Sequence, residues 1–286
     1  MILLTGITGT TGKKVVDLMC KQNIPVRALV RDPDKVKDLN MPGLEIVQGD
    51  FEDEASIEKA LTGVDKAFLL TPNVEEQLEY EMRFIDVAKR LNISHVVKLS
   101  ASSAEAGSEL VMRRYHGDAE EYLAASGLTY TNIRPNYFMQ NMMFSTASII
   151  EENKFYLPFA EGTTAIIDVD DVAAFIVETL TGSGHEGLTY VISGPETPSF
   201  YEIAEQMSSV LGREITYVDV PLEDFKAELR NWSPSDWYVD ALMEQFSIVN
   251  RGESAIFTDT FEQVMGRAPR KFTQFVADNA AAFSAS

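Results

Sequence analysis

The chain has 286 residues, and its 24 basic and 44 acidic side chains give a formal net charge of −20. This length suggests one or two domains, and 45% apolar with 24% charged residues is typical of a globular protein rather than a disordered one. The negative charge argues against binding to nucleic acid or to an anionic membrane surface, and no apolar run approaches the length of a membrane span.

The cysteine and histidine content excludes two further classes of site. Cys20 is the single cysteine, so no intramolecular disulfide forms, and the three histidines are too dispersed for a zinc motif. We expect no metal. We also expect a cytoplasmic protein without a cleaved leader, because the first strand begins at Met1.

The first half of the chain alternates short apolar strands with helices. Strands are expected at 1–5, 25–30, 44–47, 64–70, 94–99 and 128–133, with helices between them that include 53–61 and 116–126. The helix before the fifth strand carries Leu78, Met82 and Ile85 on one face. This alternation indicates βαβ units and an α/β fold with a doubly wound parallel sheet of Rossmann type, in the order 3-2-1-4-5-6.

The second half is mostly helical. Helices are expected at 168–180, 200–211, 222–229, 235–246, 257–265 and 272–283, with one strand at 188–192, whereas residues 136–165 show few clear elements. We divide the chain into a Rossmann domain at 1–150 and a smaller C-terminal lobe at 151–286, with 165–192 returning to the first domain. Asp168, Asp170 and Asp171 are interpreted as the acidic start of a helix.

A glycine-rich segment joins the first strand to the first helix. Gly6 permits a tight turn, Gly9 lets the backbone approach a pyrophosphate, and Gly12 allows close packing of the helix on the strand. Backbone N–H groups at the helix start then bind the anion. The segment therefore predicts NAD(P) binding, through Gly6, Thr8, Gly9, Thr10, Thr11 and Gly12.

The ends of the second and third strands refine this prediction. Arg31, assisted by Lys35, suits an adenosine 2′-phosphate and favours NADP(H) over NAD(H). Asp32 leaves two alternatives open, a ribose contact or a loop pair with Arg31. Asp50 and the Phe51 backbone are expected to face adenine, unless Asp50 only caps the next helix.

The chain resembles the NmrA-like branch of the atypical short-chain dehydrogenase/reductase superfamily. The resemblance rests on segments 6–12, 30–33, 49–51, 70–72, 97–100, 126–135, 138–141 and 168–173, and on the distal Leu-Gly-Arg and Met-Gly-Arg segments. Within the branch, the sequence looks like NADPH-dependent quinone and triphenylmethane-dye reductases, and also like cofactor-sensing regulators. The resemblance implies that Thr71, Pro72, Arg134 and Pro135 line the cofactor channel.

One departure concerns the Tyr-x-x-x-Lys pair of classical members. Four residues after Tyr115 stands Ala119, so the lysine is missing, and His116 occupies the position often held by lysine in the branch. A site without this acid suits acceptors whose reduced form is weakly basic or neutral, such as quinones or cationic dyes. The expected catalytic residues are His116, Tyr115 and Ser100. The alternatives are a helix-surface histidine for His116, a packing role for Tyr115 and a capping role for Ser100.

We predict an NAD(P)H-dependent oxidoreductase that transfers hydride to a quinone-like or delocalised small molecule. A flat acceptor is expected against Tyr137, Phe138, Asn141 and Phe144, with Trp232 in a lid; a core role for this aromatic stretch is the alternative. The alternative function is an NAD(P)-sensing regulator that binds a protein partner without turnover. A homo-oligomer is also left open.

Overall fold

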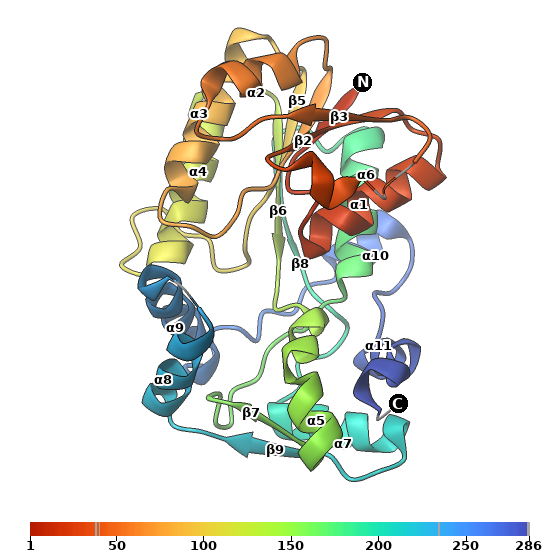
Figure 1. Cartoon of the computed structure of the whole chain (residues 1–286), viewed down its shortest axis with the longest axis vertical. Coiled ribbons are helices and arrows are strands. Elements are labelled where there is room, and N and C mark those ends of the chain that lie inside the picture. Colours follow the sequence, from red (N-terminus) through yellow and green to blue (C-terminus); the bar gives the residue numbers. More distant parts are fainter. Residues whose placement is uncertain (38, 40, 234, 285–286) are drawn as a thin grey trace. The chain divides into compact units, whose positions relative to one another are not determined.

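The computed structural model describes residues 1–37, 39, 41–233 and 235–284, coloured along the chain in Figure 1. The chain divides into two compact units. Unit 1 contains Met1–Arg134 and Val172–Tyr190, and unit 2 contains Pro135–Asp171 and Val191–Ser286. The first division thus falls at 134/135 where the sequence suggested 150, and the returning segment is 172–190 within the expected 165–192.

A seven-stranded sheet of Rossmann type forms the centre of unit 1. Its order is β3-β2-β1-β4-β5-β6-β8, which confirms the expected 3-2-1-4-5-6 and places the strand expected at 188–192 beside β6. The pairs from β3 through β6 are all parallel. The bounds are β1 Ile2–Leu4, β2 Val26–Val30, β3 Leu44–Gln48, β4 Lys66–Leu69, β5 His95–Leu99, β6 Tyr130–Pro135 and β8 Leu188–Ile192.

Helices cover both faces of this sheet. Figure 1 shows α2 (Glu54–Leu61), α3 (Gln77–Arg90) and α4 (Val111–Ala125) on one side and α1 (Thr10–Lys21) and α6 (Val169–Thr181) on the other. A short 3-10 helix, η1 (Pro33–Val36), follows β2. Helix α4 begins five residues before the expected start at 116, which places its first turn just after the loop that follows β5.

The core face of α3 differs from the apolar stripe that the sequence suggested. Ile85 is buried as expected, but Leu78 and Met82 are only half-buried. Phe84 and the charged Glu81 face inward in their place, at 0% and 1% exposed. The predicted stripe was wrong because a search for apolar periodicity gives no weight to a charged residue such as Glu81. A buried carboxylate is rare unless it is paired.

Unit 2 contains a small sheet that the sequence did not reveal. Strands β7 (Lys154–Leu157) and β9 (Thr216–Asp219) pair in parallel. Each is four residues long, too short for a period to stand out, and each needs a partner about 60 residues away. The helices are η2 Met139–Ser145, α5 Thr146–Glu152, α7 Phe200–Leu211, α8 Leu222–Trp232, α9 Asp236–Asn250, α10 Thr260–Met265, α11 Phe272–Asp278 and η3 Ala280–Phe283.

The acidic residues at the start of α6 are held by arginines of the C-terminal segment. Arg270 Nε lies 2.9 Å from Asp168 Oδ2, and Arg267 Nη2 lies 2.7 Å from Asp171 Oδ1. Asp170 and Asp171 stand in the first turn, as the sequence suggested for a helix start. These carboxylates therefore anchor the C-terminal segment within unit 2. In the described part of the chain, no group of three or more His, Cys, Asp or Glu side chains is arranged to hold a metal ion.

None of the described helices combines the length and the apolar character that a bilayer span demands.

A buried histidine in β5 makes the stability of unit 1 sensitive to acid. His95 is 3% exposed, and its Nε2 lies 2.8 Å from Thr131 Oγ1. Burial lowers the pKa of His95, and the nearby charge of Lys66 lowers it further. Folded His95 therefore binds a proton less readily than His95 in the unfolded chain, whose pKa is about 6.5. Below that pH the unfolded chain takes up the proton, and the free energy of unfolding falls; above it the free energy of unfolding keeps its full value.

We expect the free energy of unfolding in urea to fall between pH 7.5 and pH 5.5, by up to about 1.4 kcal/mol for each such histidine. His95→Gln keeps a hydrogen-bonding side chain but does not titrate, so its fall should be smaller than that of the wild type. Equal falls in the two proteins would contradict this account.

Candidate cofactor and catalytic site

The loop between β1 and α1 is shaped by its glycines. Gly6 has a φ of +69°, a conformation that side-chain-bearing residues rarely adopt, and its carbonyl accepts a bond from Gly9 N at 3.0 Å. A Cβ on Gly12 would lie 2.1 Å from Gly6 O. Gly12 is therefore required for the first turn of α1 to pack on the loop.

The outer side of the same loop is open. Thr8, Gly9 and Thr10 are exposed, whereas Thr11 is buried. A Cβ on Gly9 would meet only Gly6 O, at 3.4 Å. Helix α1 has no side-chain bond at its N-cap and no acidic residue in its first turn. An exposed helix start without a carboxylate fits the pyrophosphate of a dinucleotide.

The segment after β2 presents Arg31 to solvent. Its side chain is 72% exposed, and its Nε lies 4.0 Å from Asp50 Oδ2. Asp32 accepts a bond from Asp34 N and caps η1, so the suggested loop pair between Arg31 and Asp32 is replaced by a longer pair with Asp50. Lys35 lies exposed on η1. Both cations are thus accessible from solvent.

The residues after β3 divide between partly exposed and core positions. Asp50 accepts from Glu52 N at 3.0 Å, and it is Asp53 that caps α2 by accepting from Ala55 N. The alternative of Asp50 as the helix cap is therefore wrong. The Phe51 ring is 9% exposed and stacks on Tyr80 at 5.9 Å between centroids, so only its backbone can serve a ligand.

The ends of β4 and β5 carry two hydroxyls with different surroundings. Thr71 is buried and donates to Glu81 Oε1 at 2.7 Å, so its hydroxyl belongs to the interior, while the neighbouring Pro72 is exposed. Ser100 is 5% exposed, and its Oγ has no hydrogen-bond partner within the described residues. A buried hydroxyl without a partner is costly, which marks Ser100 as a position that a bound ligand would satisfy.

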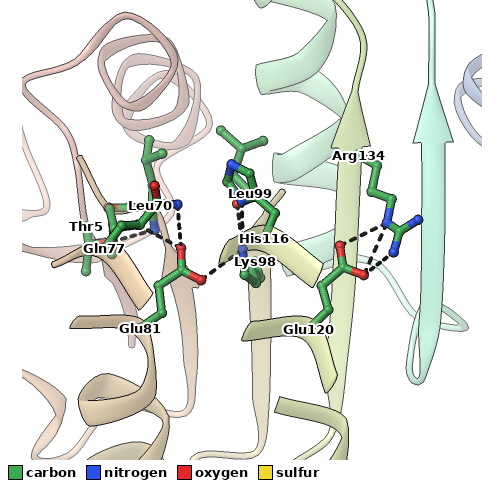
Figure 2. A network of polar contacts seen from close by, with 10 residues as sticks. Thr5, Leu70, Gln77, Glu81, Lys98, Leu99, His116, Glu120 and Arg134 are labelled. Atoms are coloured by element: carbon green, nitrogen blue, oxygen red, sulfur yellow. Dashed lines mark hydrogen bonds and ion pairs between the residues drawn. The ribbon is translucent and has the colours of Figure 1, made fainter. Parts of the chain in front are cut away.

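His116 lies on α4 beside two basic residues. Its Nδ1 is 3.3 Å from Lys98 Nζ on β5, and Arg134 on β6 pairs with Glu120 one turn further along α4 (Figure 2). Burial lowers the pKa of His116 well below its usual value, and the charges of Lys98 and then Arg134 lower it further. His116 is therefore neutral near pH 7.

Tyr115 has no lysine one helical turn beyond it. Ala119 occupies that position and is fully buried. The Arg114 guanidinium lies 5.7 Å from the centre of the Tyr115 ring. The Arg134 side chain is 24% exposed, and its Nε and Nη2 both bond to Glu120. Pro135, which follows it, is buried.

The aromatic residues expected to wall an acceptor lie in unit 2. Tyr137 packs edge-on against Phe159 and Phe200, and burial raises its pKa while the Asn141 side chain opposes the shift. Phe138 forms an isolated bridge with Ile167. In contrast, Phe144 is 90% exposed and Trp232 is 80% exposed. Tyr137 is thus part of the unit 2 interior, whereas Phe144 and Trp232 are surface side chains.

Two residues of the site were not singled out from sequence. Lys98 and Glu81 form a buried ion pair, with Nζ 3.0 Å from Oε2. The available signal was a lysine inside an otherwise apolar strand, since buried lysines occur almost only with a partner. The partner itself could not be chosen, because α3 and its flanks carry several carboxylates.

A family model described as the NmrA-like family matches residues 1–276. The NAD(P)H azoreductase of Xenophilus azovorans is 35% identical over 286 residues, covering 100% of both chains.

Two solved structures share the fold. An NADPH-dependent quinone oxidoreductase from Escherichia coli, complexed with NADPH, superposes with a TM-score of 0.87 at 26% identity and covers 97% of this chain and 99% of that one. The triphenylmethane reductase of Citrobacter sp., complexed with NADP(H), has a TM-score of 0.85 at 20% identity, and the match covers 97% of this chain and 99% of that one. At this identity the likeness shows a common fold only.

Proposed function

The chain belongs to the NmrA-like family, and from that premise we propose that it is an NAD(P)H-dependent reductase of small, delocalised acceptors such as quinones and azo compounds. The observation that carries the proposal is the exposed glycine turn at the start of α1, where Gly9 leaves room for a ligand and Gly12 does not. The names of two relatives described above support it, since they are an azoreductase and a quinone oxidoreductase.

The cofactor would be held along the edge of the sheet where the strands end. The loop from Gly6 to Gly12 binds the pyrophosphate, Arg31 and Lys35 attract the 2′-phosphate, and the Asp50 carboxylate accepts from adenine. When bound, NAD(P)H supplies the hydride. Ser100, whose hydroxyl lacks a partner in the described chain, offers a hydrogen bond to the nicotinamide ribose or to the acceptor.

The side chains near His116 restrict the acceptor. Hydride transfer to a simple ketone forms a strongly basic alkoxide and needs a general acid in place. Tyr115 lacks the lysine of the classical pair, because Ala119 stands one turn beyond it. His116, neutral and hydrogen-bonded, suits the less basic aryl oxide that forms from a quinone. We therefore place the acceptor beside His116.

The test is NADPH oxidation against a panel that contains a quinone, an azo dye, a cationic triphenylmethane dye and a simple ketone. We expect turnover of at least one delocalised acceptor and little or none of the ketone. Rapid ketone reduction would show an acid at the site that this assignment omits. Tight cofactor binding without turnover of any acceptor would overturn the proposal in favour of a sensing protein.

Cofactor preference is tested at Arg31. Arg31→Ala is expected to weaken NADPH binding by about 1.5–3 kcal/mol, the scale of a hydrogen bond to a charged group, and to leave NADH binding nearly unchanged. Arg31→Lys keeps the charge but not the planar fork, so its loss should be intermediate. Titration calorimetry with both cofactors measures these differences. Equal losses for NADPH and NADH would remove the 2′-phosphate from Arg31.

A further inference from the structure

The ion pair between Glu81 and Lys98 lies in the interior of unit 1, with side chains 1% and 0% exposed. Lys98 Nζ has three acceptors around it: Glu81 Oε2 at 3.0 Å, Leu99 O at 3.3 Å and His116 Nδ1 at 3.3 Å (Figure 2). An ammonium group has three donors and no acceptor. The three neighbours therefore match the three protons of charged Lys98.

The carboxylate of Glu81 is itself fixed. Its Oε1 accepts from Thr71 Oγ1 at 2.7 Å and from Gln77 Nε2 at 3.3 Å, which leaves Oε2 for Lys98. Burying an ion pair costs several kcal/mol per ion, and apolar replacements are often neutral or stabilising. Stability alone therefore gives little reason for this pair, and its third contact, to His116, points to another role.

The contact with Lys98 determines where the His116 proton resides. Because an ammonium only donates, His116 Nδ1 must accept, and a neutral imidazole that accepts at Nδ1 carries its proton on Nε2. Protonated imidazole has two donors and would lose the bond from Lys98. The charged groups that face the ring are Lys98 from β5 and Arg134 from β6, with Glu120 of α4 engaged by Arg134.

We propose that Glu81 and Lys98 are positioning residues that hold His116 neutral with its proton on Nε2, and that Lys98 replaces this proton through Nδ1 when it is given up. The catalytic part of this inference rests on the proposed reductase function. When a quinone has taken up hydride, its oxygen anion takes the Nε2 proton while Nδ1 takes one from Lys98 Nζ.

The transfer leaves a neutral quinol, a neutral imidazole and an uncharged Lys98 amine beside Glu81. His116 is partly exposed, so Nε2 next takes a proton from water and Nδ1 returns one to Lys98. The proton donated to the product is thus replaced from solvent. Uncharged Lys98 leaves the buried Glu81 carboxylate without its counter-ion, so the return of the proton to Lys98 is strongly favoured.

The first experiment observes His116 directly, by long-range 1H–15N NMR on the full chain, with His116→Gln to assign its signals. In the wild type we expect one tautomer, with the proton on Nε2, and no titration of the ring between pH 8 and 6. Lys98→Met leaves Glu81 as an unpaired buried charge and risks unfolding. The double variant Glu81→Gln/Lys98→Met removes both charges and keeps a partner for Thr71.

In the double variant, loss of the neighbouring positive charge should raise the pKa of His116 by about one unit or more. Lys66→Met is the matched control, since Lys66 also extends from the sheet but bonds to Leu180 O and makes no contact with His116. A proton on Nδ1 in the wild type, or a titration of His116 that is the same in the double variant, would overturn the proposal. This readout needs no turnover, so it stands or falls separately from the proposed function.

Turnover provides the second readout. With a quinone at pH 8, the double variant should lose about 10²-fold or more in kcat, the scale of general acid catalysis. The loss should shrink as the pH falls and His116 becomes able to donate as imidazolium, whereas the wild type should change little. A variant with wild-type kcat and a wild-type pH profile would show that Lys98 plays no part in the reaction.

Discussion

Gly9→Val is expected to abolish cofactor binding in a protein that still folds. The backbone of Gly9 has φ −85° and ψ 171°, which a branched residue can adopt, and an added Cβ meets only Gly6 O at 3.4 Å. The valine methyl groups would then occupy the exposed face that the pyrophosphate needs. We expect affinity for NADPH and NADH to fall by about 100-fold or more, equivalent to about 2.7 kcal/mol.

Gly12→Val is the matched control for this prediction. It adds the same side chain three residues later, but its Cβ would lie 2.1 Å from Gly6 O and 2.8 Å from the Ile7 Cα. The loop and α1 must then separate, so thermal unfolding should occur at a clearly lower temperature. The pair therefore separates a loss of binding from a loss of folding. If Gly9→Val keeps its affinity in a folded protein, the pyrophosphate does not bind at this turn.

His116→Ala should have the largest effect on turnover. If His116 gives its Nε2 proton to the oxygen of a reduced quinone, its removal should lower kcat by roughly 10²–10⁴-fold. A cationic triphenylmethane dye becomes neutral when it accepts hydride and needs no proton, so its reduction should fall much less. Steady-state assays of one quinone and one dye with NADPH measure the difference.

Two other outcomes of the His116→Ala assays carry distinct meanings. Equal losses on both acceptors would assign His116 to positioning the nicotinamide ribose, because the geometry of hydride transfer is common to both. Unchanged rates on both would remove His116 from the site. Tyr115→Phe serves as the companion variant, since it deletes the neighbouring hydroxyl and preserves the ring beside Arg114.

Sequence reasoning worked where local order carries the information. The order of the first six strands of the sheet follows from alternating strands and helices with short right-handed connections, and all seven strands of the sheet lie close to their expected positions. The glycine turn is also local, because its spacing and flanking elements lie within a dozen residues. Asp53 as the cap of α2 shows the limit, since Asp50 stood three residues away with the same chemistry.

The family and the glycine turn after β1 could thus be predicted from the sequence alone, whereas the contact of His116 with Lys98 was decided by the tertiary structure. His116, Lys98 and Glu81 come from α4, β5 and α3, and each pair is separated by at least 17 residues. No pattern within a single element encodes such a contact. The sequence did not predict the β7–β9 sheet of unit 2 for the same reason, because its two short strands become recognisable only when they pair in the folded chain.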